Sequence, residues 1–213
     1  MEIIASLDEV RRSLDVLEHP FYQRWNAGEL TPAELSLYAS EYRHAVLALA
    51  EASRRAAESA GDEHREGLQR HAEEEASHLA LWDAFADAAG ARAQERALPE
   101  TEGCVRAWTA GDDLLEHLAV LYVLEAGQPQ ISRTKLDGLA AHYGYSAEGP
   151  ATEYFRVHEH LDVEHARAAR ELIVALIARA SDPEEQAQRM RLRAQAALQG
   201  NWRLLDGVGA AGA

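Results

Sequence analysis

The sequence predicts an all-α protein, built as a bundle of about seven helices. Apolar residues recur at spacings of three and four over long stretches of the chain, which is the periodicity of one face of a helix. Residues that start and stop helices stand between these stretches. The chain also lacks segments with the strict apolar and polar alternation that is typical of a half-buried strand.

The expected helices are bounded by such signals. Ser6 with Glu9, and Thr31 with Glu34, fit a capping box, in which two side chains satisfy free amides of the first turn. Asp182 repeats the start signal directly before a proline. Stop signals between the periodic segments are Gly61, Gly90, Gly111 and Gly149. We therefore expect helices over residues 6–18, 32–60, 62–89, 101–110, 113–141, 151–180 and 183–206.

Composition and length are typical of one folded domain. The chain has 213 residues, of which 47% are hydrophobic and 27% are charged, as in ordinary globular proteins. A chain of this length suits one well-filled core, so we expect a single domain over residues 1–206. The Gly- and Ala-rich residues 207–213 offer little surface to bury, and we expect them to form a flexible tail.

Charge and cysteine content exclude several classes of partner. The formal net charge of −15 would repel phosphate backbones and anionic lipid headgroups, so we expect neither a nucleic-acid nor a membrane partner. Cys104 is the single cysteine and cannot form an intrachain disulfide, which fits a reducing compartment. We expect a cytoplasmic protein.

The expected helix over residues 62–89 carries polar side chains in the middle of its apolar face. This inward series is Leu68, His71, Glu75, His78, Trp82 and Phe85. Glu75 and His78 form a Glu-x-x-His pair on one helix surface, as in the di-iron sites of helical bundles. The same spacing also fits a solvated acidic face. Glu74, four residues before His78, is the rival of Glu75, but it lies off the centre of the inward series and we prefer Glu75. His71 could support a ligand from behind, act as a seventh ligand or be a core histidine, and we interpret it as a core histidine.

The expected helix over residues 151–180 repeats this pattern. Its inward series is Phe155, His158, Asp162, His165, Ala169 and Leu172. His158 and His165 are two turns apart, or roughly 10 Å along the axis, with Asp162 between them. Two metal ions could share these three side chains more easily than one ion could hold them all. The alternative interpretation is a generally polar helix surface.

A third helix adds Glu125, which stands in an otherwise apolar segment. Such a segment gives a lone carboxylate no ordinary reason to be buried. Pro129 removes the N–H group that would bond to the Glu125 carbonyl, so we expect a kink beside this carboxylate. Three carboxylates and three imidazoles from three helices indicate a pair of metal ions, and this ligand set suits iron or manganese.

Four segments of the chain resemble, in the same order, segments of a known family. They are EHPFYQRWNAGELTPAELSLYASEY (18–42), HLALWDAF (78–85), LEAGQPQISRTKLDGLAAHYGY (124–145) and YFRVHEHLDVEHA (154–166). The family is that of the haem-oxygenase-like di-iron oxidases, in particular the CADD-like proteins that make para-aminobenzoate. The resemblance implies a haem-oxygenase-like helical bundle. It also implies six metal ligands, namely Glu75, His78, Glu125, His158, Asp162 and His165.

The resemblance also implies roles for two other residues. In CADD-like proteins a tyrosine of the protein itself is implied as the source of the aromatic ring, and a lysine as the amino donor. Tyr22 and Lys135 match those positions. Leu124 stands where the CADD sequence has a tyrosine, and this departure favours an external substrate over self-sacrificing chemistry.

We therefore expect a non-haem di-iron oxidase that uses dioxygen and two iron ions, or a manganese–iron pair. The expected substrate is a small amine or amino acid, which would undergo N-oxygenation or oxidative cleavage. One alternative is a CADD-like self-sacrificing para-aminobenzoate synthase that uses Tyr22 and Lys135. Another is a helical binding protein without catalytic activity. TenA-type thiaminases share the architecture but need a cysteine that Cys104 does not match, and PqqC-type oxidases need no metal. A homodimer and an external reductase remain open as partners.

Overall fold

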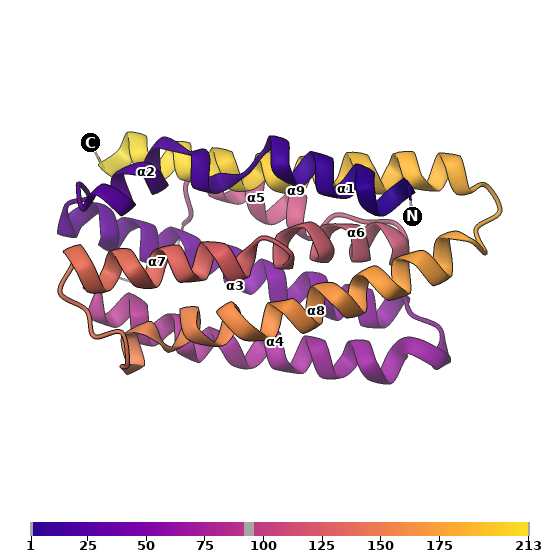
Figure 1. The fold of residues 1–213 in the computed structure, drawn as a ribbon, viewed down its shortest axis with the longest axis horizontal. Coiled ribbons are helices and arrows are strands. Elements are labelled where there is room, and N and C mark those ends of the chain that lie inside the picture. The colour runs from indigo at the N-terminus through magenta and orange to yellow at the C-terminus, as the bar shows by residue number, and fades with distance from the viewer. Residues whose placement is uncertain (1, 92–95, 213) are drawn as a thin grey trace.

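Long helices that run back and forth along one axis make up the structure (Figure 1). This computed structural model describes residues 2–91 and 96–212. The elements are α1 (Glu2–Ser13), η1 (Val16–Glu18), α2 (Pro20–Ala27), α3 (Pro32–Ser59), α4 (Asp62–Ala88), α5 (Pro99–Trp108), α6 (Leu114–Glu125), α7 (Gln128–His142), η2 (Pro150–Thr152), α8 (Glu153–Ile177) and α9 (Pro183–Gly212). The all-α prediction is confirmed, because every regular element of the described residues is helical.

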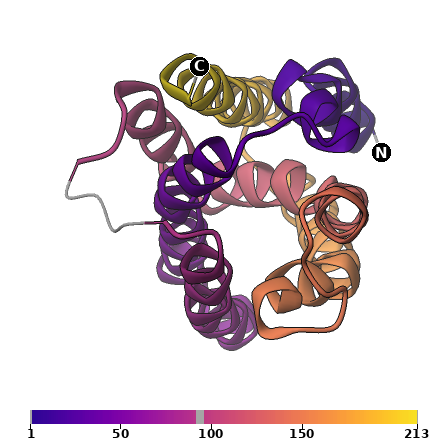
Figure 2. The ribbon, with the colours of Figure 1, turned by 90° about the vertical axis from the view of Figure 1, so that its left-hand side faces the viewer.

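The helices pack side by side around a common interior, as the end-on view shows (Figure 2). α3 packs along α4, and α8 packs on both α6 and α7. α9 contacts α1, α5 and α6. This arrangement buries one face of each of α4, α6 and α8, which are the helices expected to carry metal ligands.

The N-terminal helix differs from the prediction. α1 begins at Glu2, so Ser6 lies inside it and the expected capping box with Glu9 is wrong. The apolar stripe of Ile3, Leu7 and Val10 is buried, and burial of this stripe extends the helix beyond the apparent start signal. The chain then turns at Asp15, whose side chain accepts from the Leu17 amide at 3.0 Å and caps η1.

The short helix α2 was not predicted. Its N-cap is His19, whose ring nitrogen accepts from the Phe21 amide at 3.0 Å, and histidine is not one of the usual capping residues. Pro20 occupies the first turn, and Gly28 ends the helix with φ of 71°, a conformation that glycine adopts without strain. With only eight residues, α2 is too short to show a clear period.

The expected helix over residues 113–141 is divided into α6 and α7. α6 ends at Glu125, and α7 begins at Gln128 with Pro129 in its first turn. The prediction of one continuous helix is wrong, but the interruption lies where Pro129 was expected to produce a kink. Because proline has no N–H group, the series of helical hydrogen bonds is interrupted directly after Glu125 in the chain.

Two other cap predictions are confirmed. Thr31 Oγ1 accepts from the Glu34 amide at 3.2 Å, and Glu34 Oε2 accepts from the Thr31 amide at 2.8 Å, so the capping box at the start of α3 is complete. Asp182 Oδ1 accepts from the amides of Glu184 and Glu185 at the start of α9.

The expected flexible tail is helical as far as Gly212, whereas Ala213 lies outside the described residues. Val208 is fully buried. Small residues allow α9 to approach α5 closely here, since a Cβ atom at Gly207 would meet the Glu100 Cβ atom at 2.9 Å. None of the described helices combines the length and apolarity that crossing a bilayer requires.

Candidate metal centre

Three helices direct acidic and imidazole side chains to one buried region. α4 contributes Glu75 and His78, and Glu125 is the last residue of α6. α8 contributes His158, Asp162 and His165 from successive turns of one face. The side chains of the six predicted residues are nearly inaccessible, from 0% exposed for His158 to 10% for His165. The structure therefore brings all six residues together.

Glu75 lies at the middle of this cluster. Its carboxylate oxygens lie 3.5 Å from His78 Nδ1, 3.8 Å from His158 Nε2, 3.5 Å from His165 Nδ1 and 3.8 Å from His71 Nε2. Glu74 points outward, with 52% of its side chain exposed, and lies 3.0 Å from His165 Nε2, the nitrogen on the far side of that ring. The geometry thus favours Glu75 over Glu74 as the inward carboxylate of α4, with Glu74 positioned to orient His165 from outside.

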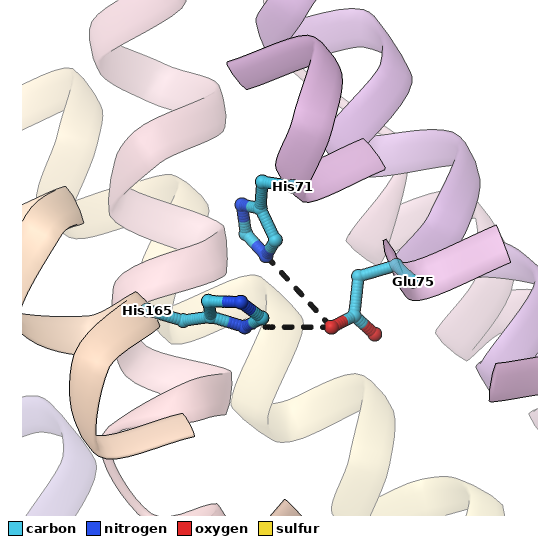
Figure 3. Close-up of side chains that lie close together, drawn as sticks. All are labelled: His71, Glu75 and His165. Atoms are coloured by element: carbon cyan, nitrogen blue, oxygen red, sulfur yellow. Dashed lines mark ion pairs between the residues drawn. The ribbon is translucent and has the colours of Figure 1, made fainter. Parts of the chain in front are cut away.

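His71 belongs to the same cluster, although we interpreted it as a core histidine. Its Nε2 atom lies 2.9 Å from Glu125 Oε1, and its ring centre lies 4.1 Å from that of His165 (Figure 3). The helical spacing that placed His71 one turn before Glu75 was the signal for this position. The structure makes His71 a candidate seventh ligand.

The cluster forms two groups of three that share one carboxylate. His71, Glu75 and His165 form one group, and Glu75, His78 and His158 form the other. In each group, one nitrogen or oxygen atom from each residue lies within 4.8 Å of the others. A carboxylate shared in this way can bridge two cations.

The residues of the cluster fit a bound cation. Most of the buried side-chain atoms that face one another here have no hydrogen-bond partner in the described part of the chain. These atoms are Glu75 Oε1, His78 Nδ1, Glu125 Oε2, His158 Nε2, Asp162 Oδ1 and His165 Nδ1. An unsatisfied buried polar atom destabilises the fold, so this concentration of them indicates a missing partner. Imidazole nitrogen and carboxylate oxygen together suit iron.

Electrostatics supports the same conclusion. Burial raises the pKa of Glu125, and the nearby His71 only partly opposes this effect. Burial also raises the pKa of Asp162. Burial would likewise raise the pKa of Glu75, but its contacts with His158 and His78 outweigh burial and hold that pKa below its ordinary value. A cation among these carboxylates would keep Glu125 and Asp162 ionised.

Hydrogen bonding orients one of the imidazoles. His158 Nδ1 lies 2.7 Å from the Tyr154 carbonyl oxygen, and a carbonyl can only accept, so Nδ1 carries the proton. In the neutral imidazole this bond leaves Nε2 of His158 without a proton and facing Glu75, which is the arrangement that metal-binding histidines use. The Tyr154 ring also stacks on the His158 ring, with centres 4.0 Å apart.

Tyr22 and Lys135, the two other predicted residues, also lie together. Lys135 is completely buried, and its Nζ atom has no hydrogen-bond partner within residues 2–91 and 96–212. Four rings surround it and form what we call the aromatic cage. Nζ lies 5.3 Å from the ring centre of Tyr22, 5.6 Å from Tyr38, 4.7 Å from Tyr42 and 5.5 Å from Phe155. Burial lowers the pKa of Lys135 to about 7.

The aromatic cage adjoins the metal centre through α8, because Phe155 lies one turn before His158. The Tyr22 and Tyr38 hydroxyls form a hydrogen bond of 2.9 Å. Burial raises the pKa of Tyr22 well above its ordinary range, so its hydroxyl stays protonated at neutral pH. Sequence reasoning did not identify Tyr38, Tyr42 or Tyr154 as part of this region, since aromatic residues at helical spacing usually indicate only a core.

One available signal for Lys135 was composition. The chain contains 21 Lys and Arg residues, and Lys135 is the single lysine among them. Every cation on the surface is therefore an arginine, which suggests that the buried position needs an amine rather than a positive charge. Burial has the opposite consequence for Cys104. It raises the pKa of the thiol and so makes Cys104 a poor nucleophile, whereas it lowers the pKa of the Lys135 amine.

A surface groove between α4 and α8 reaches the metal centre. Its lining includes His71, Glu74 and His165, together with His64 and Glu171 further out. This groove gives the centre an approach from solvent that is apolar in part, with leucines of α4, α6 and α8 lining it beside the acidic residues.

Comparisons with known proteins agree with this geometry. Residues 35–202 match the model of a family described as iron-containing redox enzymes. The chain is 34% identical to the 4-aminobenzoate synthase of Nitrosomonas europaea, over 95% of this chain and 89% of that protein. It is 31% identical to the 4-aminobenzoate synthase of Chlamydia muridarum, over 89% and 85% of the two chains, and 32% identical to that of Chlamydia trachomatis, over 83% and 81%.

Solved structures show the same fold at lower identity. A TenA homologue from Pseudomonas syringae superposes with a TM-score of 0.82 at 18% identity, covering 98% of this chain and 91% of that one. A domain of unknown function with a haem-oxygenase-like fold from Shewanella denitrificans gives a TM-score of 0.73 at 18% identity, over 99% and 90%. The expected haem-oxygenase-like bundle is confirmed.

Proposed function

Because the chain belongs to the family of iron-containing redox enzymes, we propose that it is a 4-aminobenzoate synthase that binds two iron ions and uses dioxygen. The family makes the protein a metal-dependent oxidoreductase. The 4-aminobenzoate synthases named above support the self-sacrificing alternative more than the oxidation of an external amine that we expected first. We propose that one domain, which includes α9, carries this activity.

The observation that carries the proposal is the meeting of Tyr22 and the only lysine of the chain beside the candidate centre. A tyrosine side chain holds the ring, the para oxygen and one further carbon of the product skeleton. Conversion to 4-aminobenzoate would break the Cα–Cβ bond of Tyr22, oxidise Cβ to a carboxylate and replace the hydroxyl with an amino group. We propose that Lys135 donates the nitrogen. Its Cε–Nζ bond would break with oxidation of Cε to an aldehyde, the hydroxyl oxygen of Tyr22 would leave as water, and dioxygen would be the oxidant for Cε and for Cβ.

The residues of the chain would divide this work as follows. Glu75, His78, Glu125, His158, Asp162 and His165 are the proposed ligands, with His71 as a further candidate. Iron held there would supply the oxidising chemistry by activating dioxygen. The aromatic cage excludes water and lowers the pKa of Lys135 to about 7, so that a large fraction of the amine is neutral and nucleophilic at neutral pH.

Isotope labelling tests the proposal, because the chain has one lysine. Protein made with lysine labelled with ¹⁵N at Nζ carries the label at Lys135 alone. After iron loading and exposure to air with a reductant, we expect ¹⁵N in 4-aminobenzoate and a loss of mass at Tyr22. Y22F and K135R should make no product. Y122F is the matched control, since Tyr122 donates to Asp8 at 2.8 Å away from the aromatic cage, and it should make product normally.

Oxidation of an external amine or amino acid is the second candidate function. A cavity of about 40 Å³, lined in part by Leu124, borders Glu125 and Asp162, and an external substrate would have to widen it to reach the centre from this side. In this case dioxygen consumption by the iron-loaded protein would depend on the added amine, and the mass of the chain would stay intact. An unlabelled product and an unchanged Tyr22 would therefore exclude the synthase.

A further inference from the structure

The surface groove between α4 and α8 ends at the candidate metal centre. His71 and His165 are the residues of the cluster that line it. Their side chains are 13% and 10% exposed, and both rings face Glu75 behind them (Figure 3). A path from the groove to the inner side chains of the centre therefore passes these two imidazoles.

The groove has room for a hydrated metal ion. Its volume is about 740 Å³, whereas the cavity that borders Glu125 and Asp162 from another side has about 40 Å³. One water needs roughly 10–15 Å³ in such a space, so that cavity holds about three waters. A small divalent ion in solution carries about six. The groove can therefore admit the hydrated ion, and the cavity cannot.

Glu74 differs from the other glutamates that line the groove. Arginines pair with the other three, which are Glu63 with Arg179 at 3.2 Å, Glu66 with Arg70 at 3.9 Å and Glu171 with Arg167 at 2.9 Å. Glu74 forms no such pair with an arginine among residues 2–91 and 96–212. It lies 3.0 Å from His165 Nε2, and 52% of its side chain is exposed. Glu74 is thus the carboxylate of the groove that is left for an incoming cation.

The His165 ring lies at the boundary between the groove and the centre. Its Nε2 atom faces Glu74 on the outer side. Its Nδ1 atom lies 3.5 Å from both Glu75 Oε1 and Asp162 Oδ1 on the inner side, and it is buried without a hydrogen-bond partner in the described part of the chain. Either nitrogen of an imidazole can bind a metal ion. A cation held at Glu74 would therefore be one side chain away from the inner ligands.

We infer that divalent iron enters through this groove, and that Glu74 and His165 Nε2 form a transient binding site for it at the inner end. The ion would exchange part of its water for these two groups and then pass between His71 and His165. The two rings, whose centres lie 4.1 Å apart, would have to separate for this step. The inference rests on the metal-binding part of the proposed function and does not depend on the synthesis.

Exchange rates distinguish an entry site from other roles of Glu74. A group that holds the ion only during passage lowers the barrier for entry and for exit equally, so its loss slows both rates and leaves the affinity unchanged. A group that only orients a ligand acts on the loaded centre, and its loss would weaken the affinity by roughly 10- to 100-fold.

The variant E74Q tests the transient site under anaerobic conditions, where nothing is synthesised. Glutamine keeps an oxygen that can accept from His165 Nε2 but removes the charge. Mixing iron-loaded protein with an excess of a chromogenic chelator measures exit, and adding ferrous iron to the iron-depleted protein measures entry. We expect both rates to fall by about ten-fold at low ionic strength, with unchanged affinity, and we expect added salt to reduce the difference.

E73Q is the matched control for the loss of charge. Glu73 is the exposed neighbour of Glu74 on α4, but it lines a different groove, on the side of α3. Iron should therefore enter and leave E73Q as it does the unchanged protein. Normal rates in E74Q, or a loss of affinity without slower exchange, would overturn the inference.

A second pair of variants tests the groove itself. Ala168 is exposed and lines the groove, so A168W should narrow it and slow both entry and exit. Ala76, also exposed, lines the groove on the side of α3, and A76W should have no effect on exchange. Normal exchange in A168W would show that iron uses another route. Circular dichroism verifies that each protein is folded, with and without iron.

The outcomes separate this inference from the proposed function. Slow exchange in E74Q of a protein that makes no labelled 4-aminobenzoate would remove the synthase and leave the entry site intact. Labelled product together with normal exchange in E74Q would remove the entry site alone. A protein that takes up no iron would overturn both.

Discussion

Two buried carboxylates on α6 have opposite surroundings. Glu116, in the first turn of the helix, and Glu125, at its end, are each 1% exposed. Glu116 accepts from Arg189 Nε at 3.1 Å and from Arg193 Nε at 2.7 Å, so α9 neutralises it. Glu125 faces other acids and imidazoles. His71 Nε2 lies 2.9 Å from its Oε1 atom, and its Oε2 atom has no hydrogen-bond donor within the residues described.

The difference shows that burial of a carboxylate does not by itself indicate a functional site. Glu116 is part of the packing between α6 and α9, because the protein supplies its counter-charges. Glu125 pairs with no arginine among the described residues, and the surrounding atoms, His71 Nε2 included, are those of metal ligands. The informative feature is a buried acid that the chain compensates only in part.

The variant E125Q should produce the largest effect. If Glu125 holds iron, we expect the iron content to fall and 4-aminobenzoate formation to drop by more than about 100-fold, since even residues behind the ligands can cost 10- to 100-fold. The iron-free variant should be at least as stable as the unchanged protein, because it removes a buried carboxylate whose burial outweighs the contact with His71. Iron analysis, product assay and urea unfolding measure these three effects. Normal iron content in E125Q would contradict the comparison.

The variant E116Q should show the reverse pattern. It removes the acceptor for Arg189 and Arg193, so we expect the free energy of unfolding to fall by about 1–3 kcal/mol. The loss is limited because these arginine side chains are 43% and 33% exposed and can be hydrated. Iron content and product yield per folded chain should not change. E184Q, at an exposed position of α9, is the control for charge alone.

Lys135 extends the comparison to a buried cation without a partner. Its pKa is about 7 in the folded chain and an ordinary 10.5 when unfolded, so the unfolded chain binds more protons between these values. Its destabilising effect is therefore complete below pH 7 and disappears as the pH rises towards 10.5. We expect K135M to be more stable than the unchanged protein at pH 7. The gap should shrink by at most about 1.4 kcal/mol per pH unit.

Urea unfolding of both proteins at pH 7, 8 and 9 measures this gap. A difference that does not vary with pH would mean that the folded chain keeps Lys135 protonated, and that the aromatic cage does not produce a neutral amine.

The variant H71Q should produce the smallest effect. It tests whether His71 belongs to the metal centre. If His71 takes part in holding iron, its replacement should weaken iron affinity by about ten-fold. H160Q, which alters an exposed histidine of α8, should leave the affinity unchanged. Competition for iron with a chelator provides the measurement. If H71Q and the unchanged protein bind iron with equal affinity, His71 is a core histidine, as the sequence suggested, and not a ligand.

Much of the fold follows from local signals in the sequence. The capping box at Thr31, the aspartate cap at Asp182 and the interruption at Pro129 are each determined within a few residues, and the structure shows all three. The start of α1 and the short helix α2 were missed because their helical state depends on burial against other helices. The same holds for residues 207–212. This Gly- and Ala-rich segment has few side chains to bury, but packing on α5 keeps it helical.

The sequence by itself determined which side chains share a helix face, because the period of 3.6 residues is a property of the backbone. It thereby placed Glu75 with His78, and His158 with Asp162 and His165. The helical series also favoured Glu75 over Glu74. Only the tertiary structure decided that these faces meet and that His71 approaches Glu125. Distances between helices depend on how side chains far apart in sequence pack, and local periodicity carries no information about that packing.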